Sequence, residues 1–344
     1  MLKTRRFPIR GAILFALPSL TLAFIWTSIV FSLYAFAGLE FLRIPFQPLS
    51  TMGIAVAFYV GFKNNASYDR FWEGRKIWGG IVNSSRTWGT MVVSYIRPGD
   101  DSEEARELRR VLIYRQIAWI NALRLQLRKS SRFFDKPARG TKRRLERHAE
   151  HMRNDWDKEI APFLSPEEMT ELSARLNTAT HIVTRQGTHL ADELTSQKLD
   201  LFHQIAMMDL LEELYTLQGK CERIKNTPFP RQYAEYSRIF TRVFVILVPF
   251  GLLDVFSEYV DAATSAADQA VFIVPVLASS MLISWVFATM EAIGDASEDP
   301  FERSMNDVPM NALCRTIERD LRQMLNEPDE NLPPSEQPID SLLY

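Results

Sequence analysis

Three bulky apolar side chains have a type and spacing that suggest a functional role: Ile54, Phe58 and Phe62. They recur every four residues in the uncharged stretch 44–62, which is long enough to cross a bilayer as a helix. This spacing stacks them on one helix face. Turned toward a symmetry axis, rings of such side chains would gate a pore by dewetting. Turned toward another helix, the same row would pack a membrane bundle, and the spacing leaves both possibilities open.

Residue sets that make or break covalent bonds are missing from the sequence. It contains no phosphate-binding glycine loop and no Gly-x-Ser-x-Gly elbow. His148 and His151 lie three residues apart without a third ligand in the pattern, which is typical of a solvated helix face. Cys221 and Cys314 lie in polar helical sequence and indicate neither a disulfide framework nor a metal site. We expect no enzyme, no cofactor and no bound metal.

The elements that must position the apolar row are membrane helices. Four stretches are candidate spans: residues 11–39, 44–62, 243–253 and 270–290. The third is only about 11 residues long, and Asp254 and Glu258 follow it. It crosses the membrane only if its helix continues as far as Ser257 or Val260, with these carboxylates in a wet or protein-lined setting. Pro249 inside it requires neighbouring helices to satisfy disturbed backbone groups.

Flanking charges predict the orientation of these spans. Basic residues precede the first span, follow the second and precede the third: Lys3, Arg5, Arg6 and Arg10; Lys63, Arg70, Arg75 and Lys76; Arg238 and Arg242. The connection between the third and fourth spans contains no lysine or arginine. By the positive-inside rule, both termini and the long middle region lie in the cytoplasm.

The middle region is highly charged and has helical rather than β-type spacing. Helices are predicted over residues 100–128, 142–157, 166–176 and 199–220, the first with a capping-type start. On the last of them, Leu201, Ile205, Met208 and Leu211 are predicted to share one face.

We therefore predict an all-α membrane protein with four transmembrane helices per subunit and a cytosolic helical domain. Residues 1–97 hold the first two spans, 98–235 the cytosolic domain, 236–292 the third and fourth spans, and 293–344 a cytosolic helix and an acidic, proline-rich tail. By itself that tail has the composition of a disordered segment. The net charge of -2 at pH 7 gives no reason to expect nucleic acid as a partner.

A dense polar and aromatic cluster follows the second span. It comprises Asn64, Asn65, Tyr68, Asp69, Arg70, Trp72, Glu73, Arg75 and Trp78. One interpretation is an interfacial belt of Trp and Arg at the membrane boundary. The other is that Asn64, Asn65 and Arg70 line an aqueous vestibule below the apolar row.

Three segments carry a family resemblance. They are GFKNNASYDRFWEGRKIWGGIVNSSRTW at residues 61–88, CERIKNTPFP at 221–230 and DVPMNALCRTIERDL at 307–321. They resemble the bestrophin family, in particular its bacterial members. The resemblance implies a homopentamer in the bacterial inner membrane, with one central pore through which inorganic ions pass.

The resemblance also implies roles for individual residues. The neck of a bestrophin pore is lined by three hydrophobic residues one helical turn apart on the second span, and these map onto Ile54, Phe58 and Phe62. A lower, cytosolic aperture of the family maps onto Ile205 when the sequences are registered on Cys221. A register shift would move it to Met208.

The sequence departs from the family pattern after the fourth span, where animal bestrophins have an acidic run in a calcium clasp. Here Glu298, Asp299, Glu302 and Asp307 are dispersed, with Arg303 among them. Because Ca²⁺ takes about six to eight oxygen ligands, this stretch argues against calcium gating.

Ion selectivity has to come from dipoles and vestibules, since the apolar row carries no charge. Phenyl rings have positive edges, and edges turned inward would favour chloride-type anions. The acidic connection with Asp254, Glu258, Asp261 and Asp268 would attract cations instead. The sequence favours anions, with a cation channel of the same fold or a non-conducting membrane scaffold as alternatives.

The one-sided row among small residues predicts assembly around an axis. The protein purified in mild detergent should therefore be a closed ring, with five subunits as the expected number, when its mass is measured by light scattering. A monomer would contradict this prediction.

Overall fold

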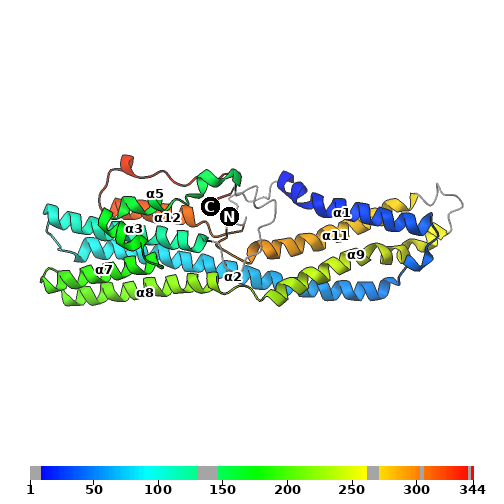
Figure 1. The fold of residues 1–344 in the computed structure, drawn as a ribbon, viewed down its shortest axis with the longest axis horizontal. Coiled ribbons are helices and arrows are strands. Elements are labelled where there is room, and N and C mark those ends of the chain that lie inside the picture. Colours follow the sequence, from blue (N-terminus) through cyan, green and yellow to red (C-terminus); the bar gives the residue numbers. More distant parts are fainter. Residues whose placement is uncertain (1–8, 130–145, 262–270, 303–305, 340–341) are drawn as a thin grey trace. The chain divides into compact units, whose positions relative to one another are not determined.

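The computed structural model describes residues 9–129, 146–261, 271–302, 306–339 and 342–344 (Figure 1). Over these residues every regular element is a helix, and the one β-bridge pairs Ile339 with Leu342. The α-helices are α1 (Ile9–Ala35), α2 (Phe46–Tyr95), α3 (Glu103–Arg128), α5 (Trp156–Ile160), α6 (Pro166–Ser173), α7 (Thr178–Thr195), α8 (Leu201–Asn226), α9 (Arg231–Asp261), α11 (Ile273–Ser297) and α12 (Met310–Met324). The predicted all-α class is confirmed.

The described chain forms two compact units. Over the described residues, the first, here called the membrane unit, lies within 9–69 and 229–298, and the second lies within 70–228 and 299–344. Four helices are long and apolar enough to cross a membrane, within the ranges Phe15–Ala35, Glu40–Tyr95, Arg231–Ser257 and Ile273–Ser297. The four predicted spans are therefore present as helices, and the protein is a membrane protein.

The boundaries of the first two spans differ from the prediction. Helix α1 ends at Ala35 rather than at residue 39, and Gly38 with a φ of 67° turns the chain a few residues later. Helix α2 continues from Phe46 through the charged cluster to Tyr95. The predicted span stopped before the charged residue Lys63, whereas the helix continues through the charged residues that follow.

The N-terminus of α2 is held by the third span. The backbone N–H of Phe46 donates to Asp254 Oδ2 at 3.0 Å, and Arg43 Nε donates to Asp254 Oδ1 at 2.9 Å. A carboxylate at a helix N-terminus satisfies a free backbone donor and complements the helix dipole. Asp254 thus has the protein-lined setting that the prediction required.

A neighbouring span contacts the helix backbone close to Pro249. Helix α1 packs along α9 and α11 within the membrane unit. From α1, Trp26 donates its indole N–H to the backbone oxygen of Ile246 at 2.9 Å, in the turn before Pro249. The carbonyl that loses its helical donor to Pro249 is that of Val245, four residues back, so the Trp26 bond is made to the residue next to the disturbed group.

The second unit has its own core, built on α3. Trp78, Trp88 and Trp119 are fully buried, and Trp88 Nε1 donates to the backbone oxygen of Leu112 at 3.2 Å. Helix α3 begins as predicted, since Ser102 Oγ accepts from the N–H of Ala105 at 3.2 Å.

Other parts of this unit differ from the predictions. Helix α7 was not predicted. Within the predicted helix 142–157, residues 146–147, the 3-10 turn Ala149–Met152 and the start of α5 are helical, and residues 142–145 lie outside the described residues. The acidic C-terminal segment packs on the unit, with Tyr344 buried and its hydroxyl 2.7 Å from His148 Nδ1.

Helices α2 and α12 approach closely at Gly89. A Cβ at this position would lie 2.5 Å from Met324 Sδ and 2.6 Å from Leu321 Cδ2. We expect Gly89→Ala to lower the thermal midpoint, measured by circular dichroism, since overpacking costs about 1–3 kcal/mol. Gly219→Ala on α8 is the matched control. Its Cβ meets nothing within 4 Å, so the midpoint should stay or rise. Equal effects of both substitutions would contradict the prediction.

Candidate functional site

The apolar row of α2 points away from the core of its own subunit. Ile54, Phe58 and Phe62 are 72%, 68% and 60% exposed, whereas Val56 and Val60 on the other side of the helix are buried. The row therefore does not pack a helix of its own chain. It is free to meet another copy, lipid or an aqueous axis.

The two phenylalanines of the row contact each other. The Phe58 and Phe62 rings have centroids 4.5 Å apart and are perpendicular. In this edge-to-face geometry the positive edge of one ring meets the negative face of the other. Each ring thus restricts the rotation of its neighbour.

A charged network lies on the buried side of α2. Lys63, only 2% exposed, donates to Glu291 Oε1 at 2.6 Å and to Asp295 Oδ1 at 2.5 Å, both on α11. Ser237 of α9 donates to Glu291 Oε2 at 2.6 Å. This buried network therefore links α2, α9 and α11.

Sequence reasoning missed this network because it treated Lys63 only as a flanking charge. A signal was nevertheless present. Lys63 follows Val56 and Val60 in helical phase, on the side opposite Ile54, and a lysine on the inward side of a span needs acidic partners.

The three residues predicted to line a vestibule lie in different settings. Asn64 is partly buried, and its amide donates to the backbone oxygen of Met290 at 3.0 Å. Gly294 permits this approach of α2 to α11, since a Cβ there would lie 2.2 Å from Asn64 Oδ1. Asn65 is exposed and follows Phe62 on the outward side of α2. In the second unit, Arg70 Nη2 donates to the backbone oxygens of Ile224 and Thr227, at 2.5 and 2.6 Å, where α8 ends.

The predicted face of α8 needs a correction. Leu201, Ile205 and Met208 are exposed, at 52%, 46% and 39%, whereas Leu211 belongs to the core together with Met207. The prediction that Leu211 shares a face with the other three is therefore wrong. Helix α8 is rotated about its axis so that Met207, Leu211 and the leucines that follow are buried. This rotation places Ile205 outside the core.

Acidic side chains follow Ile205 on the exposed side of α8. Asp209 and Glu212, at i+4 and i+7 from Ile205, are both exposed. Residues at these spacings lie on one side of a helix. Any aqueous surface that Ile205 lines would therefore carry two carboxylates per subunit as well.

The acidic residues after the fourth span are paired with basic ones. Asp299 lies 3.6 Å from Arg70, and Glu302 forms an ion pair with Lys225. Over the described residues no group of three or more His, Cys, Asp or Glu side chains could hold a metal ion.

The two cysteines are core residues. Cys221 and Cys314 are 0% and 1% exposed. Burial raises the pKa of Cys221 well above its ordinary value and the pKa of Cys314 to about 11. Both thiols therefore stay protonated and unreactive at neutral pH.

The buried network makes a prediction about stability. Lys63→Met should lower stability by about 3–5 kcal/mol, because it leaves Glu291 buried without its cationic partner. Adding Glu291→Gln should restore part of the loss. Thermal shift of detergent-purified protein measures both effects. The control is Arg86→Met, which removes a partly exposed pair with Asp320 at 2.7 Å and should change little. Equal losses for Lys63→Met and Arg86→Met would refute the prediction.

Comparison with known proteins agrees with this architecture. The family model described as "Bacterial/Fungal Bestrophin protein" matches residues 2–323. The voltage-dependent anion channel-forming protein YneE of Escherichia coli K12 is 30% identical over 327 residues, covering 94% of this chain and 91% of YneE. The voltage-dependent anion channel-forming protein RSc3414 of Ralstonia nicotianae is 28% identical over 82% of this chain and 78% of its own length.

A solved structure has the same fold. The crystal structure of a bacterial bestrophin homologue from Klebsiella pneumoniae superposes with a TM-score of 0.73 at 26% identity, covering 91% of this chain and 99% of the homologue. The family match extends over nearly the whole chain, and the fold agrees with it. The chain therefore belongs to the bacterial and fungal bestrophin family.

Proposed function

We propose that this protein is a homopentameric channel that conducts chloride-type anions passively across the bacterial inner membrane. The family match and the names of the relatives indicate a channel protein rather than an enzyme. In the proposed assembly Ile54, Phe58 and Phe62 form the pore neck, Ile205 forms a lower aperture, and both termini lie in the cytoplasm. The basic residues that flank the spans support this orientation.

The single observation that carries the proposal is the exposed apolar row. Three large side chains are 60–72% exposed on one side of a helix whose other side is buried and fixed by an ion pair. Around a five-fold axis the row would give three stacked rings, which repel water unless the neck is wide enough. Asn65 continues this exposed side and is the vestibule residue best placed to follow the neck. Asn64 and Arg70 would act there only while keeping their present contacts.

Three observations support anions as the permeant species. No charged residue interrupts the row, so a phenyl edge is the strongest polar feature that Phe58 or Phe62 can present. Asp254, one of the acidic residues that would attract cations, is paired with Arg43 at 2.9 Å. The side chains of Glu258, Asp261 and Asp268 lie outside the described residues. The relatives named above are called anion channel-forming proteins.

A cation channel of the same fold is the second candidate, and Asp209 and Glu212 favour it. If α8 turns Ile205 toward the axis, these carboxylates form negative rings beside the aperture, and such rings attract cations. The anion channel would select ions through the phenyl edges of the membrane unit. The cation channel would select them through the carboxylates of the second unit.

Reversal potentials in planar bilayers test the proposal. Under an asymmetric NaCl gradient, wild-type currents should reverse near the Cl⁻ equilibrium potential. Reversal near the Na⁺ potential would establish the cation channel instead. Asp209→Asn combined with Glu212→Gln should then abolish that preference. Protein that passes no ions at any voltage would be a scaffold, and the proposal would be wrong.

Replacing the row tests the neck. The triple Ala variant of Ile54, Phe58 and Phe62 should carry larger single-channel currents and discriminate less between ions of different size, because smaller rings lower the dewetting barrier. Phe58→Ala alone should already shift the Cl⁻ to Na⁺ permeability ratio. Val93→Ala is the control, since Val93 is a 40% exposed apolar residue of α2 outside the row. If the row only packs subunits, the triple variant should assemble poorly, and its unitary current should be unchanged or smaller.

A further inference from the structure

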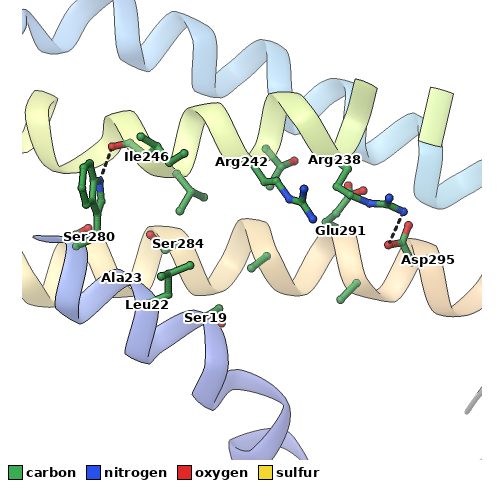
Figure 2. A pocket seen from close by; sticks show the side chains of 15 residues that line it. Ser19, Leu22, Ala23, Arg238, Arg242, Ile246, Ser280, Ser284, Glu291 and Asp295 are labelled. Carbon is green, nitrogen blue, oxygen red and sulfur yellow. Dashed lines mark hydrogen bonds and ion pairs between the residues drawn. The ribbon is translucent and has the colours of Figure 1, made fainter. Parts of the chain in front are cut away.

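A groove with a cavity of about 580 Å³ lies in the membrane unit between α1, α9 and α11 (Figure 2). Its long walls are apolar, with Leu22 and Trp26 from α1, Val245 and Ile246 from α9 and Ala288 from α11. Leu22 is 68% exposed and Ile246 is 50% exposed, so these walls are open to whatever surrounds the subunit. An apolar chain fits such walls better than water does.

One end of the groove is charged. Figure 2 shows Arg238 and Arg242 of α9 at this end, with Glu291 and Asp295 of α11 beside them. Glu291 and Asp295 both accept from Lys63, at 2.6 and 2.5 Å. The two carboxylates are therefore already engaged by a buried cation.

The two arginines differ in their partners. Arg238 lies 3.0 Å from Glu235 and 3.6 Å from Asp295. Arg242 has no hydrogen bond or ion pair with any residue in the described part of the chain, and it is exposed. The guanidinium of Arg242 is thus without an anionic partner at the end of the apolar groove.

Arg242 lies one turn further along α9 than Arg238, within the candidate span Arg231–Ser257. An arginine at this depth without an anion is costly, and its planar guanidinium matches the oxygens of a phosphate in a bidentate contact. A free phosphate would satisfy the charge and leave the apolar walls uncovered. A phospholipid satisfies both ends of the groove.

We propose that this groove binds one anionic phospholipid per subunit, with its phosphate on Arg242 and an acyl chain along Leu22, Trp26 and Ile246. The assignment rests on the proposed function for its membrane orientation, which puts Arg242 in the cytoplasmic leaflet. The bound lipid links α1 to α9 and α11 and gives the Arg242 guanidinium an anionic partner.

Native mass spectrometry of the detergent-purified protein tests the proposal. After equal exposure to phosphatidylglycerol and phosphatidylcholine of the same chain length, we expect about fivefold greater retention of phosphatidylglycerol, the effect of one well-placed arginine. Arg242→Gln should remove this preference. Ala288→Trp, which fills the groove and keeps Arg242, should reduce the retention of both lipids. Inorganic phosphate at the same concentration should not displace the lipid.

The control is Arg223→Gln, on an exposed arginine of the second unit that pairs with Glu73, and it should retain lipid like the wild type. Unchanged preference in Arg242→Gln overturns the proposal, as does displacement by inorganic phosphate. Loss of oligomer mass in Ala288→Trp with unchanged lipid retention would assign the groove to a second copy of the chain. Because no current is measured, a protein that conducts no ions can still pass this test, and a conducting protein can fail it.

Discussion

A lysine buried in a membrane helix needs anionic partners, and on α2 this requirement falls on Lys63. Its two carboxylate partners lie on α11, and one of them also accepts from Ser237 on α9. Removing Lys63 leaves the carboxylate of Glu291 in surroundings where a charge is poorly solvated. The rotation of α2 about its own axis is therefore fixed. With Lys63 turned inward, the row that begins at Ile54 has to point outward.

The same ion pairs determine which charged side chains at the groove have a partner. Glu291 and Asp295 are engaged by Lys63, and Asp295 also lies near Arg238, so Arg242 remains without a partner among the described residues. The outward orientation of the row and the unpaired guanidinium of Arg242 at the groove therefore have one origin. At the other end of the membrane unit, Asp254 has a comparable role, because it holds both Arg43 and the first backbone N–H of α2.

Those features of the fold and the candidate site that depend on a strong local sequence pattern could be predicted. Those that depend on tertiary packing could not. The four spans, the capped start of α3 and the one-sided row on α2 follow from uncharged length, a serine cap and a four-residue period. The length of α2 did not follow, because a charged residue at the end of an apolar run looks the same whether it is solvated or paired inside. The rotation of α8 depends on tertiary packing around Met207 and Leu211, and the apolar spacing of this helix fits two faces. Helix α7 was missed because its buried residues are mixed with threonine, glutamine and histidine.

The burial of Cys221 and Cys314 has a practical consequence. Neither native thiol is accessible or ionised at neutral pH, so the wild-type chain already serves as a silent background for thiol chemistry. A single cysteine introduced along the outward side of α2, at Phe58 or Asn65 for example, would be the only site that a charged methanethiosulfonate reagent modifies. The permeation path could then be mapped residue by residue without first removing any native cysteine.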